Sequence, residues 1–168
     1  MFKSRPLVII ATLVSMLPAM AIAQEGGAVT ITIGDNTYDF PLSESQSDWS
    51  GPISFANIYI DTRPMDEGTR ELFNHFSLGF DYFGEQIDYA EATLIRVIDG
   101  ELVYYYANAE DTDIVLTIEE ESVDGEFLTI AGNAEMTMGT SENFGRDIDL
   151  SDPLSLSASF AVTLGPVD

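Results

Sequence analysis

Apolar and polar residues alternate along several stretches of the chain, and the alternation is most regular near the C-terminus. Between Leu154 and Leu164 every second residue is apolar, and serine, alanine or threonine fills the positions between them. A period of two puts the apolar side chains on one face of an extended strand, so this stretch predicts a strand that covers a core. The same period predicts shorter strands with these inward-facing residues: Val29, Ile31 and Ile33; Tyr38, Phe40 and Leu42; and Phe76, Leu78, Phe80 and Tyr82.

Two turn motifs join neighbouring strands into hairpins. Gly34-Asp35-Asn36 separates the first two runs, and Asp99-Gly100 is typical of a type I′ turn, whose central residues both need positive φ. A two-residue loop at Asp99-Gly100 predicts three cross-strand pairs: Val97 with Leu102, Ile95 with Tyr104, and Thr93 with Tyr106. We expect this face to belong to the core, and the opposite, mixed face to carry Leu94, Arg96, Val103 and Tyr105.

A second turn motif, Asp124-Gly125, predicts a different register. A two-residue loop there would place Glu119 and Glu121 on the same face as Ile130, where burial of carboxylates is costly. We therefore expect a three-residue loop at residues 123–125, with Gly125 left-handed in a G1 bulge, and both glutamates turned toward water. The residues that this register brings to the apolar face are Ile118, opposite Ile130, with Leu116 and Ile114.

Helical periodicity is confined to residues 69–76. Leu72, Phe73 and Phe76 would face inward on two helical turns, but Gly68 directly before the stretch limits its length, so we expect at most one short helix. Turn-forming and acidic residues are mixed in three stretches that we expect to be loops: residues 43–52, 61–68 and 139–153.

The pattern as a whole predicts an all-β domain. About nine or ten short strands without an alternating helix pattern are typical of an antiparallel β-sandwich or a closed β-barrel. A small outer-membrane β-barrel is a competing interpretation, because the last strand alternates apolar with small polar residues. The irregular strand lengths and the absence of an aromatic residue at the chain end, residues 165–168, argue against it.

The first 23 residues have the composition of a secretory signal peptide. Lys3 and Arg5 form a basic start, an apolar run begins at Leu7, and small residues frame a cleavage site after Ala23. An uncleaved anchor is the alternative, but it needs about 20 continuous apolar residues, and Pro18 interrupts this run. The sequence therefore predicts a signal peptide at residues 1–23, a single domain at residues 24–168, and a periplasmic or secreted location.

Charge narrows the choice of partners. The chain has 6 lysines and arginines against 29 aspartates and glutamates, and loss of Lys3 and Arg5 would leave four arginines and a net charge of −25. A field of this sign repels phosphates, so we expect no nucleic-acid binding, and we expect no membrane insertion after removal of the leader. Cations or basic partners are possible, although a solvated acidic surface is the simpler explanation. The chain has no cysteine, so it forms no disulfide and carries no thiol for a lipid anchor.

No catalytic motif stands out. His75 is the single histidine, and no GxSxG-like motif supplies a nucleophile, so we interpret it as a structural or surface residue. One histidine without cysteine nearly excludes a zinc or copper site. Acidic residues are so numerous that no pair stands out as the acid and base of a carboxylate-based hydrolase. The sequence thus predicts no catalytic, cofactor-binding or metal-ligating residue.

One acidic loop has spacing compatible with Ca²⁺. Asp147, Asp149 and Asp152 alternate with other residues on an extended segment, and Ca²⁺ takes six to eight oxygen ligands. The spacing does not match an EF-hand, because the glycine and the closing glutamate are out of position. A weaker group, Glu110, Asp111 and Asp113, is more simply a hydrated turn. A Ca²⁺-dependent binding domain is therefore an alternative function.

Aromatic residues suggest carbohydrate binding only weakly. Tyr104, Tyr105 and Tyr106 would point to alternating faces of a strand, so they form no flat platform, and we expect Tyr104 and Tyr106 to fill the core. We expect Trp49, the single tryptophan, to be a buried plug. The favoured hypothesis is an exported, non-enzymatic β-sandwich that acts as a binding, adhesion or envelope-associated module.

Overall fold

The computed structural model describes residues 26–84 and 86–167, so the predicted leader at residues 1–23 lies outside the described residues. Nearly all of the described chain is β-structure, which confirms the predicted fold class. One short α-helix, α1, spans Glu67–Leu72. The strands are β1 (Gly26–Ile33), β2 (Asn36–Pro41), β3 (Asp48–Ser50), β4 (Ala56–Thr62), β5 (Phe73–Phe83), β6 (Gln86–Ile98), β7 (Glu101–Asn108), β8 (Ile114–Asp124), β9 (Phe127–Thr140) and β10 (Asp149–Pro166).

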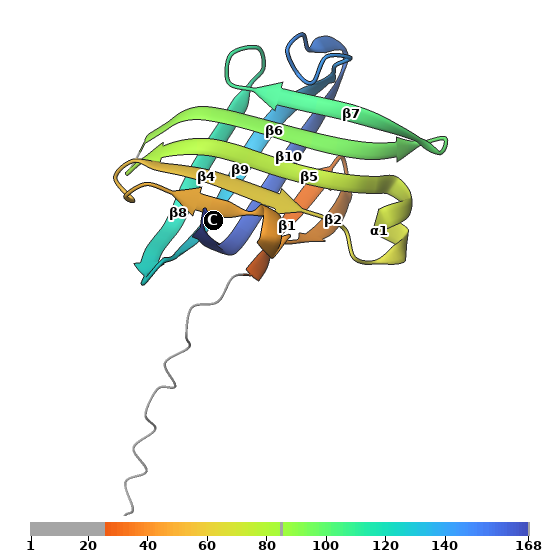
Figure 1. Cartoon of the computed structure of the whole chain (residues 1–168). Coiled ribbons are helices and arrows are strands. Elements are labelled where there is room, and N and C mark those ends of the chain that lie inside the picture. The colour runs from red at the N-terminus through yellow and green to blue at the C-terminus, as the bar shows by residue number, and fades with distance from the viewer. Residues whose placement is uncertain (1–25, 85, 168) are drawn as a thin grey trace, which may run out of the picture.

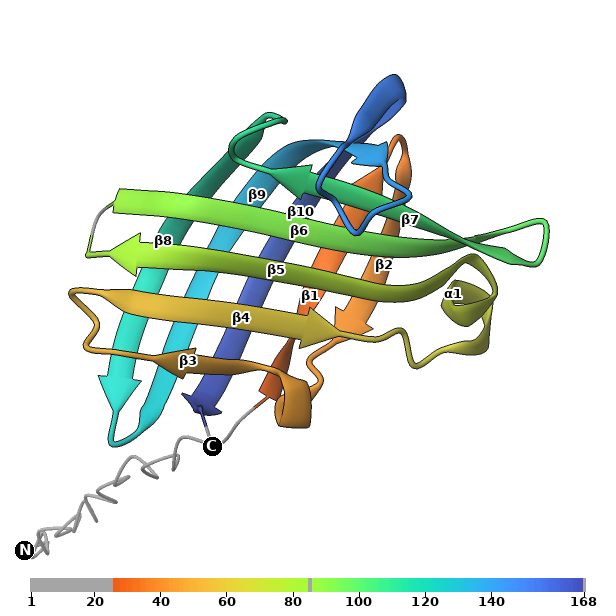
Figure 2. The ribbon, with the colours of Figure 1, turned by 45° about the horizontal axis from the view of Figure 1, so that its top comes forward.

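The strands form two layers that face each other (Figures 1 and 2). The first layer has the order β2-β1-β10-β9-β8, and the second has the order β3-β4-β5-β6-β7. Two corners join the layers. At one corner β10 pairs in parallel with β3, and at the other β7 pairs with β9 at Tyr105 and Tyr106. The molecule is therefore a β-sandwich whose sheets close on each other like a flattened barrel.

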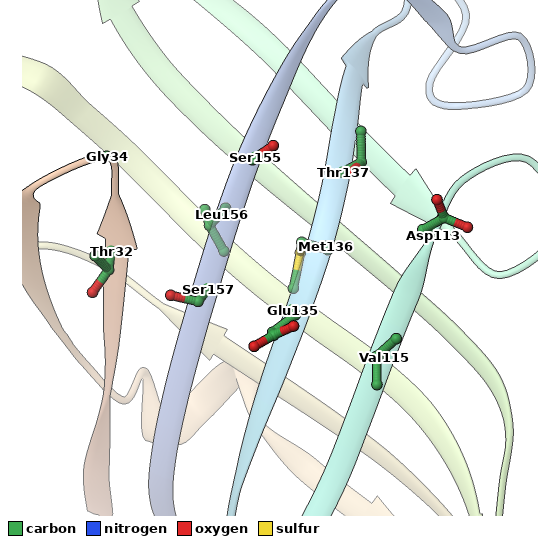
Figure 3. Close-up of a pocket in the computed structure, with 10 residues that line it drawn as sticks. All are labelled: Thr32, Gly34, Asp113, Val115, Glu135, Met136, Thr137, Ser155, Leu156 and Ser157. Atoms are coloured by element: carbon green, nitrogen blue, oxygen red, sulfur yellow. The ribbon is translucent and has the colours of Figure 1, made fainter.

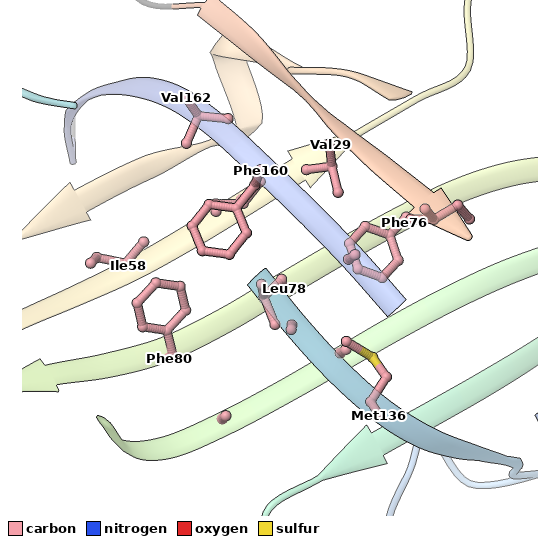
Figure 4. Close-up of a cluster of buried hydrophobic side chains, with 14 of the residues drawn as sticks. Val29, Ile58, Phe76, Leu78, Phe80, Met136, Phe160 and Val162 are labelled. Carbon is pink, nitrogen blue, oxygen red and sulfur yellow. The ribbon is translucent and has the colours of Figure 1, made fainter. Parts of the chain in front are cut away.

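Large apolar side chains from both layers meet between the sheets (Figure 4). Phe80 of β5 packs against Phe160 of β10, with ring centroids 6.4 Å apart. The predicted alternation is confirmed, because the inward positions of the strands are buried or packed against the core. The residues concerned are Val29, Ile31, Ile33, Tyr38, Phe40, Leu42, Phe76, Leu78, Phe80, Tyr82, Leu154, Leu156, Ala158, Phe160, Val162 and Leu164.

Trp49 is the buried plug that the sequence predicts. Its side chain is 9% exposed, and its indole Nε1–H donates to the carbonyl of Glu126 at 3.0 Å. Its own carbonyl accepts from the amide of Val167 at 3.1 Å. Trp49 therefore ties the β3–β10 corner to the β8–β9 turn.

The β6–β7 hairpin has the predicted register, but its faces are the reverse of the prediction. Thr93 lies opposite Tyr106 and Ile95 opposite Tyr104, as expected. However, Leu94 is fully buried, whereas Tyr104 is 39% exposed. The buried face is built from small residues and Leu94, which fit beside the large side chains of β5. At the turn end of the hairpin, the apolar residues Ile98 and Leu102 are exposed. The residues that face the core are Ala90, Ala92, Leu94, Tyr105 and Ala107.

The predicted register of β8 and β9 is wrong, because the register shift lies at a bulge within β8 and not at the turn. The turn has two residues, because Asp124 pairs with Phe127, and the register shift occurs at a bulge between Ile118 and Glu120. Ile118 consequently lies opposite Gly132 rather than Ile130. The bulge, rather than the turn, therefore shifts the register so that the apolar residues of β8 face the core and the glutamates face solvent. Ile114, Leu116 and Ile118 pack against the core, and Glu119 and Glu121 are exposed, as predicted.

The predicted helix and loops are shifted. α1 begins at Glu67 and ends at Leu72, so Phe73 and Phe76, which were expected on the helix, belong to β5 instead. Asp66 caps the helix by accepting from the amide of Thr69 at 2.9 Å. The three predicted loops contain a 3-10 turn at Glu44–Gln46, β3, the end of β4, the start of α1, the end of β9 and the start of β10. Within the described ranges, no helix is long and apolar enough to span a membrane.

We expect Gly132→Ala to destabilise the sandwich, because the bulge presses β8 against this position. A Cβ at Gly132 would lie 2.2 Å from the carbonyl oxygen of Thr117 and 2.8 Å from Cζ of Phe160. We expect the free energy of unfolding in urea to fall by about 1–3 kcal/mol. Asn133→Ala, at the exposed neighbouring position, should change it by no more than about 0.5 kcal/mol. Equal losses in the two variants would contradict this account of the bulge.

Candidate functional site

The outer face of the second sheet carries two rows of side chains that point away from the core. The pairing of β4 to β7 aligns Asp61, Ser77, Thr93 and Tyr106 in one row. The same pairing aligns Tyr59, Gly79, Glu91 and Asn108 in the next. Because side chains alternate along each strand, the large core residues are excluded from this face. The rows combine small residues in the middle with aromatic and polar residues at either side.

A pocket of about 370 Å³ lies over these rows. Ser77, Gly79 and Thr93 from β5 and β6 are small, so they leave a recess between the flanking side chains. The pocket opens to solvent, and its walls come from β4, the start of β6, β7 and the connection between β9 and β10. The wall residues are Tyr59, Tyr89, Glu91, Tyr106, Asn108, Phe144, Gly145 and Arg146.

The wall on the β4 and β6 side is held by contacts among its own residues. Gly79 has no side chain, and a Cβ there would lie 3.4 Å from the ring of Tyr59 and 3.5 Å from Cγ of Glu91. The hydroxyl of Tyr89 donates to Oε2 of Glu91 at 2.9 Å. This hydrogen bond, with burial and nearby carboxylates, raises the pKa of the Tyr89 phenol. The Tyr89 proton is thereby kept on the phenol, and the carboxylate of Glu91 is oriented along the rim.

The opposite wall is the connection between β9 and β10, residues 141–148, which lies over β7 (Figure 2). The hydroxyl of Ser141 accepts from the amide of Gly145 at 2.9 Å. The side chain of Asn143 accepts from the amide of Asp147 at 2.9 Å and donates to the carboxylate of Asp147. Gly145 packs on Tyr106, because a Cβ at Gly145 would lie 3.0 Å from Cδ1 of that ring. The loop is therefore fixed internally and against the sheet.

Phe144 is the most unusual residue of this wall. It has φ of 61°, in the left-handed region that bulky side chains rarely adopt, and its side chain is 88% exposed. An exposed ring gains almost nothing from packing, so the fold bears the conformational cost without a return in stability. Arg146 follows two residues later and is exposed. In the part of the chain that the structure describes, no carboxylate lies within ion-pair distance of Arg146.

His75 forms a buried pair with Asp61 on the same face, next to the pocket. The distance from His75 Nε2 to Asp61 Oδ2 is 3.5 Å, and the side chains are 14% and 7% exposed. Burial lowers the pKa of His75 and raises the pKa of Asp61, and the attraction between the two groups offsets part of each shift. Arg63 lies 4.0 Å from the other oxygen of Asp61. These contacts agree with the interpretation of His75 as a structural residue.

Within the described ranges, the Asp61–His75 pair has no nucleophile partner of the kind that a catalytic triad needs. A triad needs a nucleophile hydrogen-bonded to one imidazole nitrogen and an acid on the other. The buried hydroxyl of Ser47 instead donates to the carbonyl of Asp61 at 3.0 Å and accepts from its amide at 2.8 Å. Asp61 and His75 thus fasten the β3–β4 region to β5.

The acidic segment considered as a Ca²⁺ site lies in and after the 141–148 loop. Asp147 is engaged with Asn143, and Asp149 accepts from the amide of Ser151 at 2.8 Å, which lowers the pKa of Asp149. Asp152 is exposed in the first part of β10. Among the residues that the structure describes, no group of three or more acidic, histidine or cysteine side chains is placed to hold a metal ion.

The weaker acidic group forms a turn after β7. The side chain of Asn108 accepts from the amides of Glu110 and Asp111 and donates to the carboxylate of Asp111. Asp113 lies apart from these residues, at the start of β8, where its carbonyl accepts from the amide of Thr137. The side-chain amide of Asn108 is thus hydrogen-bonded within its own turn, although Asn108 also lines the pocket.

A second depression, of about 410 Å³, lies on the outer face of the first sheet (Figure 3). Its side chains come from β1, β8, β9, β10 and the residue before β8, and they are mainly hydroxyls and carboxylates, with Glu135 on β9 and Asp113 directly before β8. It contains no aromatic and no cationic side chain. The pocket on the second sheet combines more kinds of contact, so it is the stronger candidate.

Comparison of the chain with protein-family models, curated proteins and solved structures finds no match. The function must therefore be argued from the arrangement of residues alone.

The sequence pattern did not predict this pocket, because the expected faces of the β6–β7 hairpin placed Tyr106 and Thr93 in the core. The pattern also placed Phe144 in an ordinary loop. The one available indication was a large aromatic residue, directly before a glycine, in a stretch otherwise made of polar and turn-forming residues.

We expect Phe144→Gly to be at least as stable as the natural chain. Glycine adopts positive φ without steric cost, whereas an L-residue in this region costs about 1–2 kcal/mol. Phe144→Ala is the matched control, because it removes the exposed ring but keeps the strain. We expect the glycine variant to exceed the alanine variant by about 1 kcal/mol in urea unfolding. A glycine variant less stable than the alanine variant would show that the backbone here is not strained.

We expect His75 to make the protein lose stability as the pH falls below about 6.5, the ordinary pKa of histidine. The folded state has the lower His75 pKa, so it binds fewer protons than the unfolded state in this window. The raised pKa of Asp61 acts in the opposite direction, and it adds stability as the pH falls toward 3.8. Urea unfolding between pH 7.5 and pH 5.5 should show a steeper loss for the natural chain than for His75→Gln. Identical slopes would contradict the assignment.

Proposed function

We propose that the protein is an exported, non-enzymatic binding module and that its ligand site is the pocket between Tyr59, Glu91, Tyr106 and the 141–148 loop. The composition of residues 1–23 supports export. The absence of any motif for covalent or metal chemistry supports binding rather than catalysis.

The single observation that carries this proposal is the exposed ring and strained backbone of Phe144. Its ring is 88% exposed, and its backbone is held at φ of 61°. Strained residues in folded proteins concentrate at functional sites, where the surrounding structure enforces them. Aromatic residues, phenylalanine included, are also enriched at protein interfaces, where a bound partner covers them. Phe144 combines both features at the mouth of one pocket.

The rigidity of the site favours binding further. The floor belongs to β5 and β6, which are hydrogen-bonded to neighbouring strands on both sides. The Ser141 and Asn143 side chains fix the loop before any ligand arrives. Ligand binding then orders few groups, so little conformational entropy is lost on association.

The net charge of the chain limits the classes of ligand that such a module can bind. The whole chain has a formal charge of −23, and the described arginines are few. Nucleic acids and anionic membranes are repelled by this field, which favours neutral or basic components of the extracytoplasmic environment.

We expect Phe144→Ala to weaken binding of the protein to the envelope of the cells that produce it. The test purifies the chain from those cells, checks that it begins at Gln24, and measures cosedimentation with isolated envelope particles. Loss of one aromatic contact at the mouth of the pocket should raise the apparent dissociation constant at least about ten-fold, corresponding to about 1.4 kcal/mol.

Met65→Ala is the control for this experiment. Met65 is 72% exposed and lies between β4 and α1, outside the pocket lining. It should leave cosedimentation unchanged. Equal retention of the natural chain and both variants would refute the pocket as the binding site, and an intact leader on the purified chain would refute removal of the leader.

A further inference from the structure

Electrostatics excludes strongly anionic ligands from the pocket. Glu91 lines it, and the charges of Glu110 and Asp81 reach Tyr89 on its rim. Arg146 is the one cation among the lining residues. A phosphate, sulfate or uronate group would therefore meet more negative than positive charge, within a molecule that is itself highly acidic.

Ammonium ligands and basic peptides also fit poorly at this position. A cation held against the rings would lie in a pocket whose wall already carries a positive charge, which repels it. Here the guanidinium of Arg146 stands in the wall. An extended peptide cannot join the floor as an additional strand, because β5 and β6 already pair on both edges.

The side chains that remain match a polyhydroxylated ring. Tyr59, Tyr106 and Phe144 provide aromatic groups, and the partly negative face of such a ring attracts polarised C–H groups. Glu91 and Arg146 provide planar acceptor and donor groups that can each form two hydrogen bonds with neighbouring hydroxyls. Ser77 and Thr93 add hydroxyls on the floor. A sugar ring has an apolar C–H face and a belt of hydroxyls, and so it uses both kinds of contact at once.

The size and openness of the pocket agree with this chemistry. Its volume of about 370 Å³ is at the lower end of small-molecule sites, which range over about 300–1,000 Å³. The pocket opens to solvent on an outer sheet face, so a longer glycan can extend from the bound segment.

From these observations we infer that the pocket binds a neutral saccharide, as a short segment of a longer glycan. This inference rests on the proposed function, since it names the class of ligand for the same site.

The test titrates the full exported chain with named probes and follows them by calorimetry and by backbone amide shifts. The first arm uses uncharged oligosaccharides of glucose, mannose, galactose and N-acetylglucosamine. The second arm uses polygalacturonate and heparin, and the third uses oligolysine. We expect binding in the first arm alone, with shifts at Gly79, Thr93 and Gly145.

Salt and two substitutions distinguish recognition of a neutral ligand from attraction between charges. Binding of a neutral saccharide should not change between 50 mM and 500 mM NaCl. Phe144→Ala should weaken it at least ten-fold. Arg146→Gln keeps planar hydrogen-bonding groups without the charge, so it should weaken binding less than three-fold. Met65→Ala should have no effect.

The outcomes separate this inference from the proposed function. Binding of heparin or oligolysine with shifts at the same pocket residues, without any neutral saccharide, would overturn the ligand class and leave the pocket as the binding site. Absence of binding in every arm, while Phe144→Ala still reduces envelope cosedimentation, would also overturn the ligand class alone. Absence of binding together with unchanged cosedimentation would overturn both.

Discussion

Burial of one face of each sheet against the other is the interaction on which the remainder of this structure depends. The chain has no cysteine, so no disulfide contributes, and packing between Phe76, Leu78 and Phe80 on one side and Phe160 on the other has to hold the layers together. The corners at β3–β10 and β7–β9 fix how the layers meet. Since the core takes the large aliphatic residues, the outer face of the second sheet can carry glycine, serine and threonine at its centre without loss of stability. A recess on that face is therefore a by-product of the alternation that builds the core, and the Gly145 contact with Tyr106 supplies its second wall.

The features that stabilise the fold lie apart from the strained residue of the proposed binding site. The strands beneath the pocket are regular and hydrogen-bonded on both sides, whereas the strain is concentrated at Phe144, in a loop stabilised by its own side chains. In a flexible loop, a strained residue would relax to a backbone conformation of lower energy. The hydrogen bonds of Ser141 and Asn143 therefore keep Phe144 in its exposed conformation. The buried Asp61–His75 pair has a different task, because it connects neighbouring strands and contains no reactive partner in the described ranges. Proximity of a histidine to a pocket is thus insufficient to assign chemistry to it.

The alternation of residues predicted the strands, because a period of two is a local property that a strand converts directly into one buried face. Cross-strand pairing of Ile95 with Tyr104 also followed from the Asp99-Gly100 turn. The choice of face did not follow, because Ala90 and Ala92 face large neighbours on β5, and small residues give a weak pattern. The bulge beside Ile118 and the packing of Gly145 on Tyr106 depend on residues distant in the sequence. The site could not be predicted for the same reason, since its walls come from β4, β6, β7 and the β9–β10 connection, which only the closed sandwich brings together.

The edges of the sandwich are poorly suited to pairing with another chain, which favours the proposed site on a sheet face. The outermost strands of the first sheet are β2 and β8, and an exposed strand edge can pair with another chain. The edge of β8 carries the exposed residues Glu119, Glu120 and Glu121 together with the bulge, and both features oppose the approach of a second strand. β2 is short and ends at Pro41, which lacks a backbone donor. Pairing through the backbone is therefore disfavoured at both ends of this sheet. The recess beneath Phe144 differs from the one on the outer face of the first sheet, because it brings aromatic, hydroxyl, carboxylate and guanidinium groups to the same volume.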